Sequence, residues 1–209
     1  MLYYERKAKK EGFSQLIGVD EVGRGALAGP VVAAAVLLKK KKFKHKVYDS
    51  KELSPPQRLR AYDEIIKNSY YGIGVINEKM IDTLGIREAT TKAMENAIGD
   101  LIRTLNRIRL LSKKVFILAD GDLKLSVPYP CRSICNLDKK SLSCASASII
   151  AKIIRDRIMA IYDSVYSDYD FLKNKGYGTR KHVRSIKKYG ISSIHRKTFR
   201  PIKTLIEND

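Results

Sequence analysis

The chain of 209 residues carries 41 Lys and Arg against 22 Asp and Glu, which gives a formal net charge of +19. A charge of this size favours a polyanionic partner, most simply nucleic acid. The alternative at this level is a soluble protein with a lysine-rich surface. With 44% hydrophobic residues the chain can bury a normal core, and its length suits one large domain or one domain with a small appendage.

Composition and short motifs exclude several classes of protein. No apolar run approaches the roughly 20 residues that span a bilayer. The first residues, 1–7, lack the apolar region of a signal peptide. The cysteines at 131, 135 and 144 do not have the spacing of a structural zinc site, and they suit buried thiols in a reducing compartment. We therefore expect a monomeric cytoplasmic protein with no membrane partner.

In chain order, the hydrophobic pattern first predicts a hairpin. Residues 15–24 and 31–38 have the pattern of strands, and the turn between them is rich in glycine and proline. A lysine-rich run at 39–46 follows as a loop or an exposed edge. Next, Ser54 can cap a helix whose apolar residues recur three and four apart.

Further strands and helices alternate along the rest of the chain. The predicted strands are residues 70–76, 115–119 and, more weakly, 133–137. The predicted helices are residues 77–105 with a break at Gly85, 143–162 and 179–189. The uninterrupted apolar run at 115–119 is typical of a strand buried on both faces. This order predicts an α/β fold with a mixed sheet flanked by helices, comprising a core of residues 1–170 and a small helical C-terminal element of residues 171–209.

The C-terminal element is strongly basic. From residue 171 onward, eleven Lys and Arg stand against two acids, and aromatic residues such as Tyr177 and Phe199 lie among them. Basic and aromatic side chains together suit neutralisation of a nucleic-acid backbone and stacking on sugars or bases.

Four acids follow or end predicted strands. Asp20 and Glu21 are adjacent near the end of the first strand, Asp120 ends the apolar strand, and Asp138 follows the last strand. Ligands cluster outside strand ends in α/β sheets, so these carboxylates can converge there. Hard oxygen ligands suit Mg²⁺ or Mn²⁺, and acids around two such ions fit metal-assisted phosphodiester hydrolysis.

Each acid also has a plainer interpretation. Asp138 can be a helix cap, and Asp120 before Gly121 can be a turn residue. Neighbours on a regular strand point to opposite faces, so Asp20 and Glu21 share a site only if the strand ends or bulges there. The glycines that follow permit such a distortion, but the sequence does not show it.

The stretch from Gly18 to Val36, which contains Asp20-Glu21 and Gly23-Arg24-Gly25, resembles the signature of bacterial ribonuclease HII. Further segments resemble motifs of this family in the family's order, and the resemblance covers residues 15–201. They are Asp49 to Ser54, Ile117 to Gly121, Asp138 to Ser141, Ala147 to Lys152, Lys175 to Thr179 and His195 to Phe199.

The resemblance implies a ribonuclease-H-like fold and hydrolysis of the RNA strand of RNA–DNA hybrids. It further implies cleavage at single ribonucleotides embedded in duplex DNA, leaving 5′-phosphate and 3′-hydroxyl ends, and a role in ribonucleotide removal during DNA repair and replication. By resemblance, the four metal-binding catalytic acids are Asp20, Glu21, Asp120 and Asp138, with two Mg²⁺ or Mn²⁺ ions when substrate is bound.

The resemblance also implies residues that bind the nucleic acid. Gly23-Arg24-Gly25 would read the ribose 2′-hydroxyl through backbone groups, which is the group that separates RNA from DNA. Tyr177 would pack on the sugar after the ribonucleotide. The residues expected to bind phosphates are Lys51, Ser148, Lys152 and Arg155.

The chain departs from the family pattern at three positions. Ala26 stands where proline is usual, Leu137 stands where glycine commonly precedes the fourth acid, and Asp122 adds a fifth acid that we expect to be exposed. Two rival hypotheses are a non-catalytic nucleic-acid-binding protein and a metal nuclease of the same fold class that acts on DNA alone. Acids at strand ends disfavour the first, and the glycine motif with Tyr177 disfavours the second.

Overall fold

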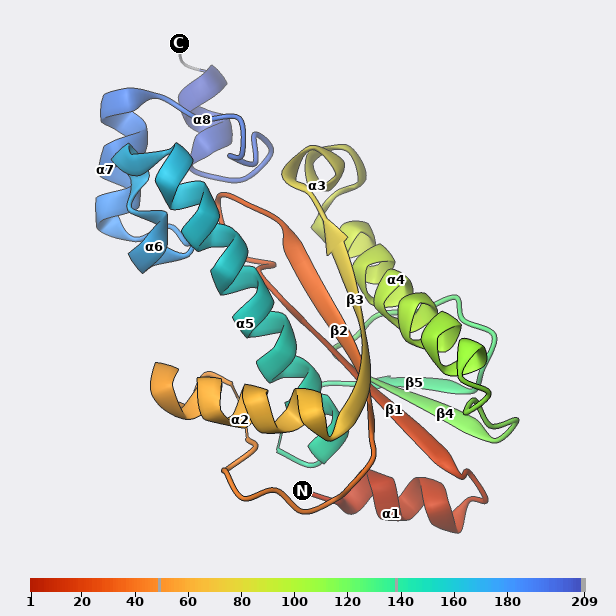
Figure 1. Cartoon of the computed structure of the whole chain (residues 1–209). Helices are drawn as coiled ribbons and strands as arrows, with labels where there is room; N and C mark the ends of the chain where they lie inside the picture. The colour runs from red at the N-terminus through yellow and green to blue at the C-terminus, as the bar shows by residue number, and fades with distance from the viewer. Residues whose placement is uncertain (49, 138, 208–209) are drawn as a thin grey trace.

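The computed structural model describes residues 1–48, 50–137 and 139–207. In chain order the elements are α1 (Tyr3–Lys10), β1 (Gln15–Val22), β2 (Val31–Leu38), α2 (Pro55–Lys67), β3 (Ser69–Ile76), α3 (Glu78–Leu84), α4 (Ile86–Arg107), β4 (Val115–Asp120), β5 (Cys131–Ile134), α5 (Leu142–Val165), η1 (Ser167–Tyr169), α6 (Phe171–Asn174), α7 (Arg180–Tyr189) and α8 (Ile202–Glu207) (Figure 1).

The five strands form one mixed sheet in the order β3-β2-β1-β4-β5. The pairs β3-β2 and β2-β1 are antiparallel, whereas β1-β4 and β4-β5 are parallel. The predicted hairpin and the mixed sheet are thus confirmed. β4 lies inside the sheet, as its uninterrupted apolar sequence predicts.

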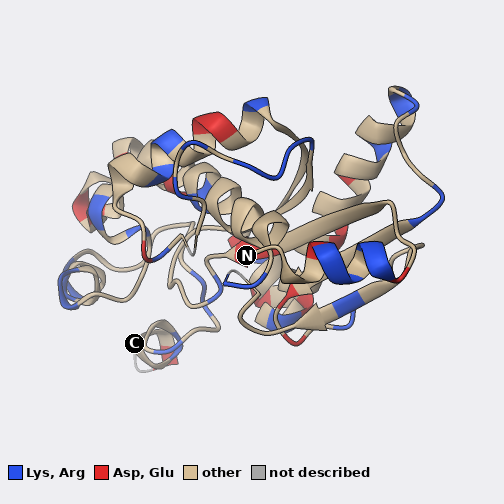
Figure 2. Cartoon of the chain, turned by 90° about the horizontal axis from the view of Figure 1, so that it is seen from below, with Lys and Arg blue, Asp and Glu red and all other residues tan. Residues whose placement is uncertain are grey.

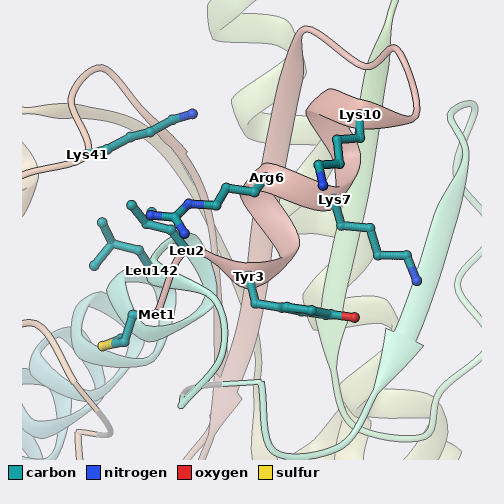
Figure 3. Close-up of a pocket in the computed structure, with 8 residues that line it drawn as sticks. All are labelled: Met1, Leu2, Tyr3, Arg6, Lys7, Lys10, Lys41 and Leu142. Atoms are coloured by element: carbon teal, nitrogen blue, oxygen red, sulfur yellow. The ribbon is translucent and has the colours of Figure 1, made fainter.

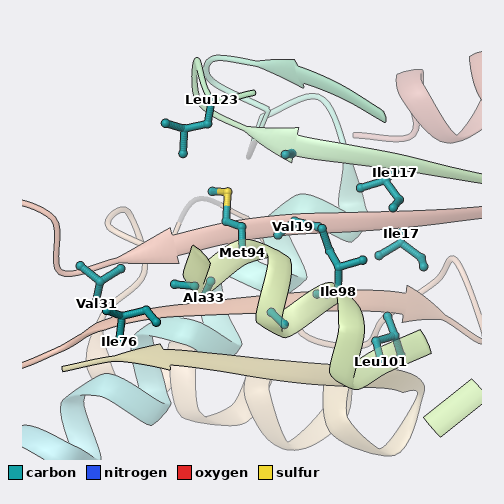
Figure 4. Close-up of a cluster of buried hydrophobic side chains, with 14 of the residues drawn as sticks. Ile17, Val19, Val31, Ala33, Ile76, Met94, Ile98, Leu101, Ile117 and Leu123 are labelled. Carbon is teal, nitrogen blue, oxygen red and sulfur yellow. The ribbon is translucent and has the colours of Figure 1, made fainter. Parts of the chain in front are cut away.

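Helices cover both faces of the sheet. α4 packs on β3 and β2 on one side, and α5 packs on β1 and β2 on the other, with α2 beside it (Figure 1). Figure 4 shows the core on the α4 side, where Met94, Ile98 and Leu101 of the helix meet Ile17 and Val19 of β1. Because β2 lies between these layers, its side chains from residue 31 to 37 are all buried.

Local signals explain where several of these elements begin and end. Ser54 and Gln57 form a reciprocal capping box at the start of α2. Gly85 has a φ of 77°, and it separates α3 from α4 as predicted. The last strand lies at Cys131–Ile134, two to three residues earlier than predicted, because its parallel pairing with β4 ends where Asp120 meets Ile134.

The short C-terminal helices share a small core with the rest of the chain. Phe171 and Tyr169 pack with Met159 of α5 and with Leu27 and Ala28 of the turn after β1. This cluster draws residues from both sides of position 170, and the boundary at 170 stays a prediction. Lys and Arg lie on helices and loops across the whole view of Figure 2, not on the C-terminal element alone. No helix within the described residues is long and apolar enough to cross a membrane.

Candidate active site

The parallel pairing of β1 with β4 places two acids side by side. The last paired residues are Val19 and Ala119, so Asp20 and Asp120 both follow one step later on the same face. Asp20, Glu21 and Asp120 line one cavity of about 530 Å³. The structure therefore places three of the four predicted acids on the lining of one cavity. Asp138 lies outside the described residues.

The adjacent acids reach the same cavity because β1 loses one neighbour there. From Asp20 to Val22, β1 still pairs with β2 but is no longer paired with β4. The side of the strand that faced β4 is therefore open, and Glu21 can line the cavity as well as Asp20. A pronounced bulge is not needed.

Burial and neighbouring negative charges disfavour the ionised form of these carboxylates. Burial raises the pKa of Asp20 well above its usual range, and the charges of Glu21 and Asp120 raise it further. Hydrogen bonds from the Ser148 hydroxyl and from the Glu21 N–H, which lies 2.8 Å from Oδ1, offset only part of this effect. Burial also raises the pKa of Glu21, against an ion pair with Arg24 at 3.3 Å. A cation in the cavity would relieve this repulsion.

The donor set fits a hard divalent cation, but the described residues do not complete a site. Among residues 1–48, 50–137 and 139–207, no three acids, histidines or cysteines stand close enough to hold an ion by themselves. Mg²⁺ commonly keeps several waters and binds one or two carboxylates together with substrate phosphates. Two or three carboxylates around an open cavity match that preference.

Most of the predicted phosphate binders line the same cavity. Lys51 and Lys152 lie on its wall with Ser148, whose hydroxyl is 2.9 Å from that of Ser50. Lys152 also forms an ion pair with Asp156 at 2.7 Å, and burial lowers the pKa of its ammonium. These side chains can meet a polyanion that enters the cavity from solvent.

The cavity is also lined by residues that were not among the predicted site residues. Ser50 lies inside the recognised Asp49 to Ser54 segment, so that motif is a signal for it. Cys135 and Asn136 lie there because the chain turns after β5, with Asn136 at a φ of 61°. The Leu137 N–H then donates to Asp120 Oδ2 at 3.1 Å. No sequence pattern announces this turn.

Glycine is present at positions 23 and 25 of the turn after β1 for different structural reasons. Gly23 has a φ of 97°, and a Cβ there would collide with the Arg155 side chain. Gly25 is exposed, and a Cβ on it would meet nothing within 4 Å. Of this motif, Arg24 lines the cavity, with Tyr177 on the same wall. Open space beside Gly25 permits a ligand to approach the backbone closely.

The structure contradicts the predicted phosphate-binding role of Arg155. Its side chain is fully buried, and its guanidinium donates to the carbonyls of Pro30 at 2.9 Å, Lys175 at 2.8 Å and Ala28 at 3.1 Å. The guanidinium also lies 5.4 Å from the centre of the Tyr177 ring. With its donors used by the backbone, Arg155 supports the turn and Tyr177 instead of reaching a phosphate.

Two buried histidines hold the backbone of Tyr177. His182 Nδ1 lies 2.9 Å from the Tyr177 carbonyl, and its Nε2 lies 3.0 Å from Nε2 of His195. His195 Nδ1 accepts from the Ser192 N–H at 2.9 Å. These partners assign the proton to Nδ1 of His182 and to Nε2 of His195, so both rings are neutral.

A fall in pH is therefore expected to destabilise the folded protein through this histidine pair. Burial and the neighbouring His182 lower the pKa of His195 to about 4, and burial lowers that of His182. Between pH 6.5 and 4 the unfolded chain binds a proton that folded His195 does not, so stability falls as pH falls, by up to about 1.4 kcal/mol per pH unit. The free energy of unfolding, measured from pH 7 to pH 5, checks this.

Comparison with His195→Gln isolates the effect, because the carboxyl groups titrate in both proteins. The glutamine can accept from Ser192 and donate to His182, but it cannot take up a proton. The wild type should lose stability more steeply than the variant as pH falls. Parallel curves would show that His195 is not the group responsible.

A larger cavity of about 800 Å³ lies elsewhere, between α1 and the start of α5 (Figure 3). Its lining combines apolar residues such as Leu2 and Leu142 with four basic side chains, and it contains no acid. The basic residues are Arg6, Lys7, Lys10 and Lys41. This lining cannot hold a divalent cation, so the smaller acidic cavity is the candidate active site.

A mixed sheet with acids where two parallel strands end defines the ribonuclease-H-like class of nuclease. The family model described as Ribonuclease HII matches residues 17–202. "Ribonuclease HII" from Enterococcus faecalis is 43% identical over 207 residues, which cover 99% of this chain and 77% of the relative. The chain belongs to the ribonuclease HII family, and it is an endoribonuclease.

Solved structures agree on the fold. The crystal structure of ribonuclease H2 from Pyrococcus horikoshii has a TM-score of 0.74 at 24% identity, covering 93% of this chain and 98% of that one. Bst-RNase HIII in complex with Mn²⁺ has a TM-score of 0.70 at 18% identity, covering 96% and 72%. At these identities the likeness concerns the ribonuclease-H-like fold alone.

Proposed function

We propose that this endoribonuclease is metal-dependent, hydrolyses the RNA strand of RNA–DNA hybrids and cuts at single ribonucleotides embedded in duplex DNA. The observation that carries the proposal is the single cavity lined by Asp20, Glu21 and Asp120 with Arg24 and Tyr177. It combines a cluster of acids with groups that can contact a nucleic acid. Products with 5′-phosphate and 3′-hydroxyl ends follow from hydrolysis of this kind.

Asp20, Glu21 and Asp120 would hold Mg²⁺ or Mn²⁺, and Asp138 would join them. When bound, two such ions would supply activation of a water and stabilisation of the leaving oxygen of the phosphodiester. The Mn²⁺ complex of a protein with the same fold supports a divalent ion. The chain's own contribution would be to place these carboxylates around one cavity, with Ser148 orienting Asp20 and with Lys51 and Lys152 on the wall that the substrate phosphates would meet.

Recognition of the ribonucleotide would come from the turn after β1. The exposed Gly25 leaves room for a ribose beside the backbone, and the 2′-hydroxyl can both donate and accept a hydrogen bond. Tyr177, with Arg155 beneath its ring, would pack on the following sugar. These features favour a substrate with RNA at the cleavage point. A role in removing ribonucleotides from DNA, as a monomer in the cytoplasm, stays a prediction.

A duplex that contains one ribonucleotide in otherwise DNA strands tests the proposal. With Mg²⁺ we expect one cut at the ribonucleotide, and no cut of an all-DNA duplex of the same sequence. With EDTA in place of Mg²⁺ we expect no product. Gel analysis of end-labelled strands gives the position and the end groups. Equal cleavage of both duplexes would refute the substrate, and cleavage in EDTA would refute the metal requirement.

A further inference from the structure

Arg196 is fully buried, and its guanidinium makes hydrogen bonds to the turn that follows β1, although the two are far apart in the sequence. Its Nε and one terminal nitrogen donate to the Gly29 carbonyl at 3.0 and 2.7 Å, and the other terminal nitrogen donates to the Arg24 carbonyl at 2.9 Å. It forms no ion pair with any acid among the described residues. Burial, with the charge of Arg155, lowers the pKa of Arg196 to about 9. An unpaired charge is costly to bury, so the backbone carbonyls that Arg196 binds indicate what it is there to position.

The hydrogen bond from Arg196 to the Arg24 carbonyl fixes the direction of the Gly25 N–H. In a trans peptide the carbonyl oxygen and the N–H of the following residue point in opposite directions. Because the Arg24 carbonyl points at the buried guanidinium, the Gly25 N–H points away from it. The Gly25 N–H makes no hydrogen bond within the described part of the chain. A free donor therefore stands beside the open space at Gly25.

The local sequence does not fix this peptide by itself. The Ala26 N–H lies 3.4 Å from the Gly23 carbonyl, so residues 23–26 form a four-residue turn with a weak closing bond. Arg24 and Gly25 occupy its central positions, and the peptide between them is the one that flips between type I and type II turns. Glycine at the third position tolerates both forms, and Gly25 is not at positive φ here. The contact that holds the Arg24 carbonyl inward comes from Arg196, 172 residues away.

We propose that Arg196 is a positioning residue for ribonucleotide recognition, which locks the Arg24–Gly25 peptide so that the Gly25 N–H faces the 2′-hydroxyl of the substrate. The proposal rests on the proposed function, since it assumes that the turn meets a ribose. Arg155 holds the other half of the turn, and its hydrogen bonds go to the carbonyls of Ala28, Pro30 and Lys175 instead of Arg24. Discrimination between RNA and DNA then depends on a side chain that never contacts the substrate.

Arg196→Lys tests this, because lysine keeps the charge but cannot reach two carbonyls with a planar fork. Two constants are measured in Mg²⁺: the KM for the duplex with one ribonucleotide, and the Ki of the all-DNA duplex as a competitive inhibitor. Neither depends on the fraction of enzyme that is folded. We expect the KM to rise about tenfold, the size of one lost hydrogen bond. The Ki should stay within about twofold of the wild type, since all-DNA offers no 2′-hydroxyl to lose.

Arg58→Lys is the matched control. Arg58 is also buried and also donates to two backbone carbonyls, those of Ser50 at 2.9 Å and Leu53 at 2.8 Å, neither of which belongs to the glycine turn. Its variant should keep the wild-type ratio of Ki to KM, even if both constants change. A wild-type ratio in Arg196→Lys would overturn the proposal, and so would an equal loss of ratio in Arg58→Lys.

Equal cleavage of the two duplexes by the wild type would instead refute the proposed function itself, whereas an equal KM and Ki in the wild type would overturn the proposal. If Arg196→Lys does not fold, the Gly25 amide of the wild type can be followed by ¹⁵N NMR. It should shift with the ribonucleotide duplex and stay in place with the all-DNA duplex, under EDTA to prevent cleavage. A Gly25 signal that responds equally to both duplexes would overturn the proposal.

Discussion

Asp20→Asn is expected to abolish turnover and, at the same time, to stabilise the metal-free protein. Turnover should fall by more than about a hundredfold, because changing even the outer-shell partners of a metal site typically costs 10–100-fold. Stability should rise because asparagine keeps the shape of the side chain but removes a buried charge that faces Glu21 and Asp120. Activity and stability thus respond in opposite directions.

The sign of the pH dependence follows from the raised pKa of Asp20. In the unfolded chain this carboxyl ionises near pH 4, whereas in the folded protein its pKa is well above that value. Stability from this group is therefore lost as pH rises from about 4 through the folded pKa. In EDTA at pH 8, Asp20→Asn should unfold at a higher temperature than the wild type. Adding Mg²⁺ should stabilise the wild type more, since the ion binds only the folded carboxylates.

Asp122→Asn provides the matched control. Asp122 lies just after the acids of the cavity, but its side chain is 91% exposed, as the sequence predicted. The same substitution there should leave turnover, melting temperature and the response to Mg²⁺ close to the wild type. Mg²⁺-dependent turnover of Asp20→Asn above a hundredth of the wild type would remove Asp20 from the metal site. A lower melting temperature in EDTA would refute the charge argument.

The elements that the sequence predicted best are those with a strong local signal. The apolar runs of β2 and β4, the helix start after Ser54 and the break at Gly85 all appear where expected. α1 was not predicted, because a helix of eight residues depends on packing. It is held by Glu5, whose Oε1 accepts from the Ser141 hydroxyl at 2.8 Å and the Ser143 N–H at 3.0 Å. Those partners lie more than 130 residues away, so no local pattern reveals them.

The sequence indicated acids at strand ends as a candidate site, but it did not indicate the residues that support them. Parallel pairing of two strands that end in acids brings Asp20 and Asp120 together, which the order of strands already suggested. Arg155 was expected to bind phosphate from the resemblance to the ribonuclease HII family. Its carbonyl partners come from residues 28, 30 and 175, and this arrangement exists only once the chain has folded. Arg196 was hidden for the same reason.

Gly18→Ala is expected to destabilise the protein by more than about 3 kcal/mol, beyond the usual range for overpacking. A Cβ on Gly18 would overlap the backbone of Ser143 and Cys144 at the start of α5, so a helix and not a flexible side chain would have to move. Urea unfolding followed by circular dichroism measures the effect. Gly99→Ala is the control: its Cβ would meet only Arg103 at 3.5 Å, inside helix α4. There, alanine should stabilise by up to about 1 kcal/mol.

The close approach at Gly18 also sets the active site. From Gly18 to Asp20 the strand advances roughly 6.6 Å, and from Cys144 to Ser148 the helix advances roughly 6.0 Å. The two steps match, so the contact at Gly18 brings Ser148 level with Asp20, where its hydroxyl supports the carboxylate. If Gly18→Ala folds at all, α5 must stand further from β1, and turnover should fall with the stability. A stable and fully active Gly18→Ala would show that α5 can shift without disturbing Asp20, and that this glycine does not set the geometry of the acids.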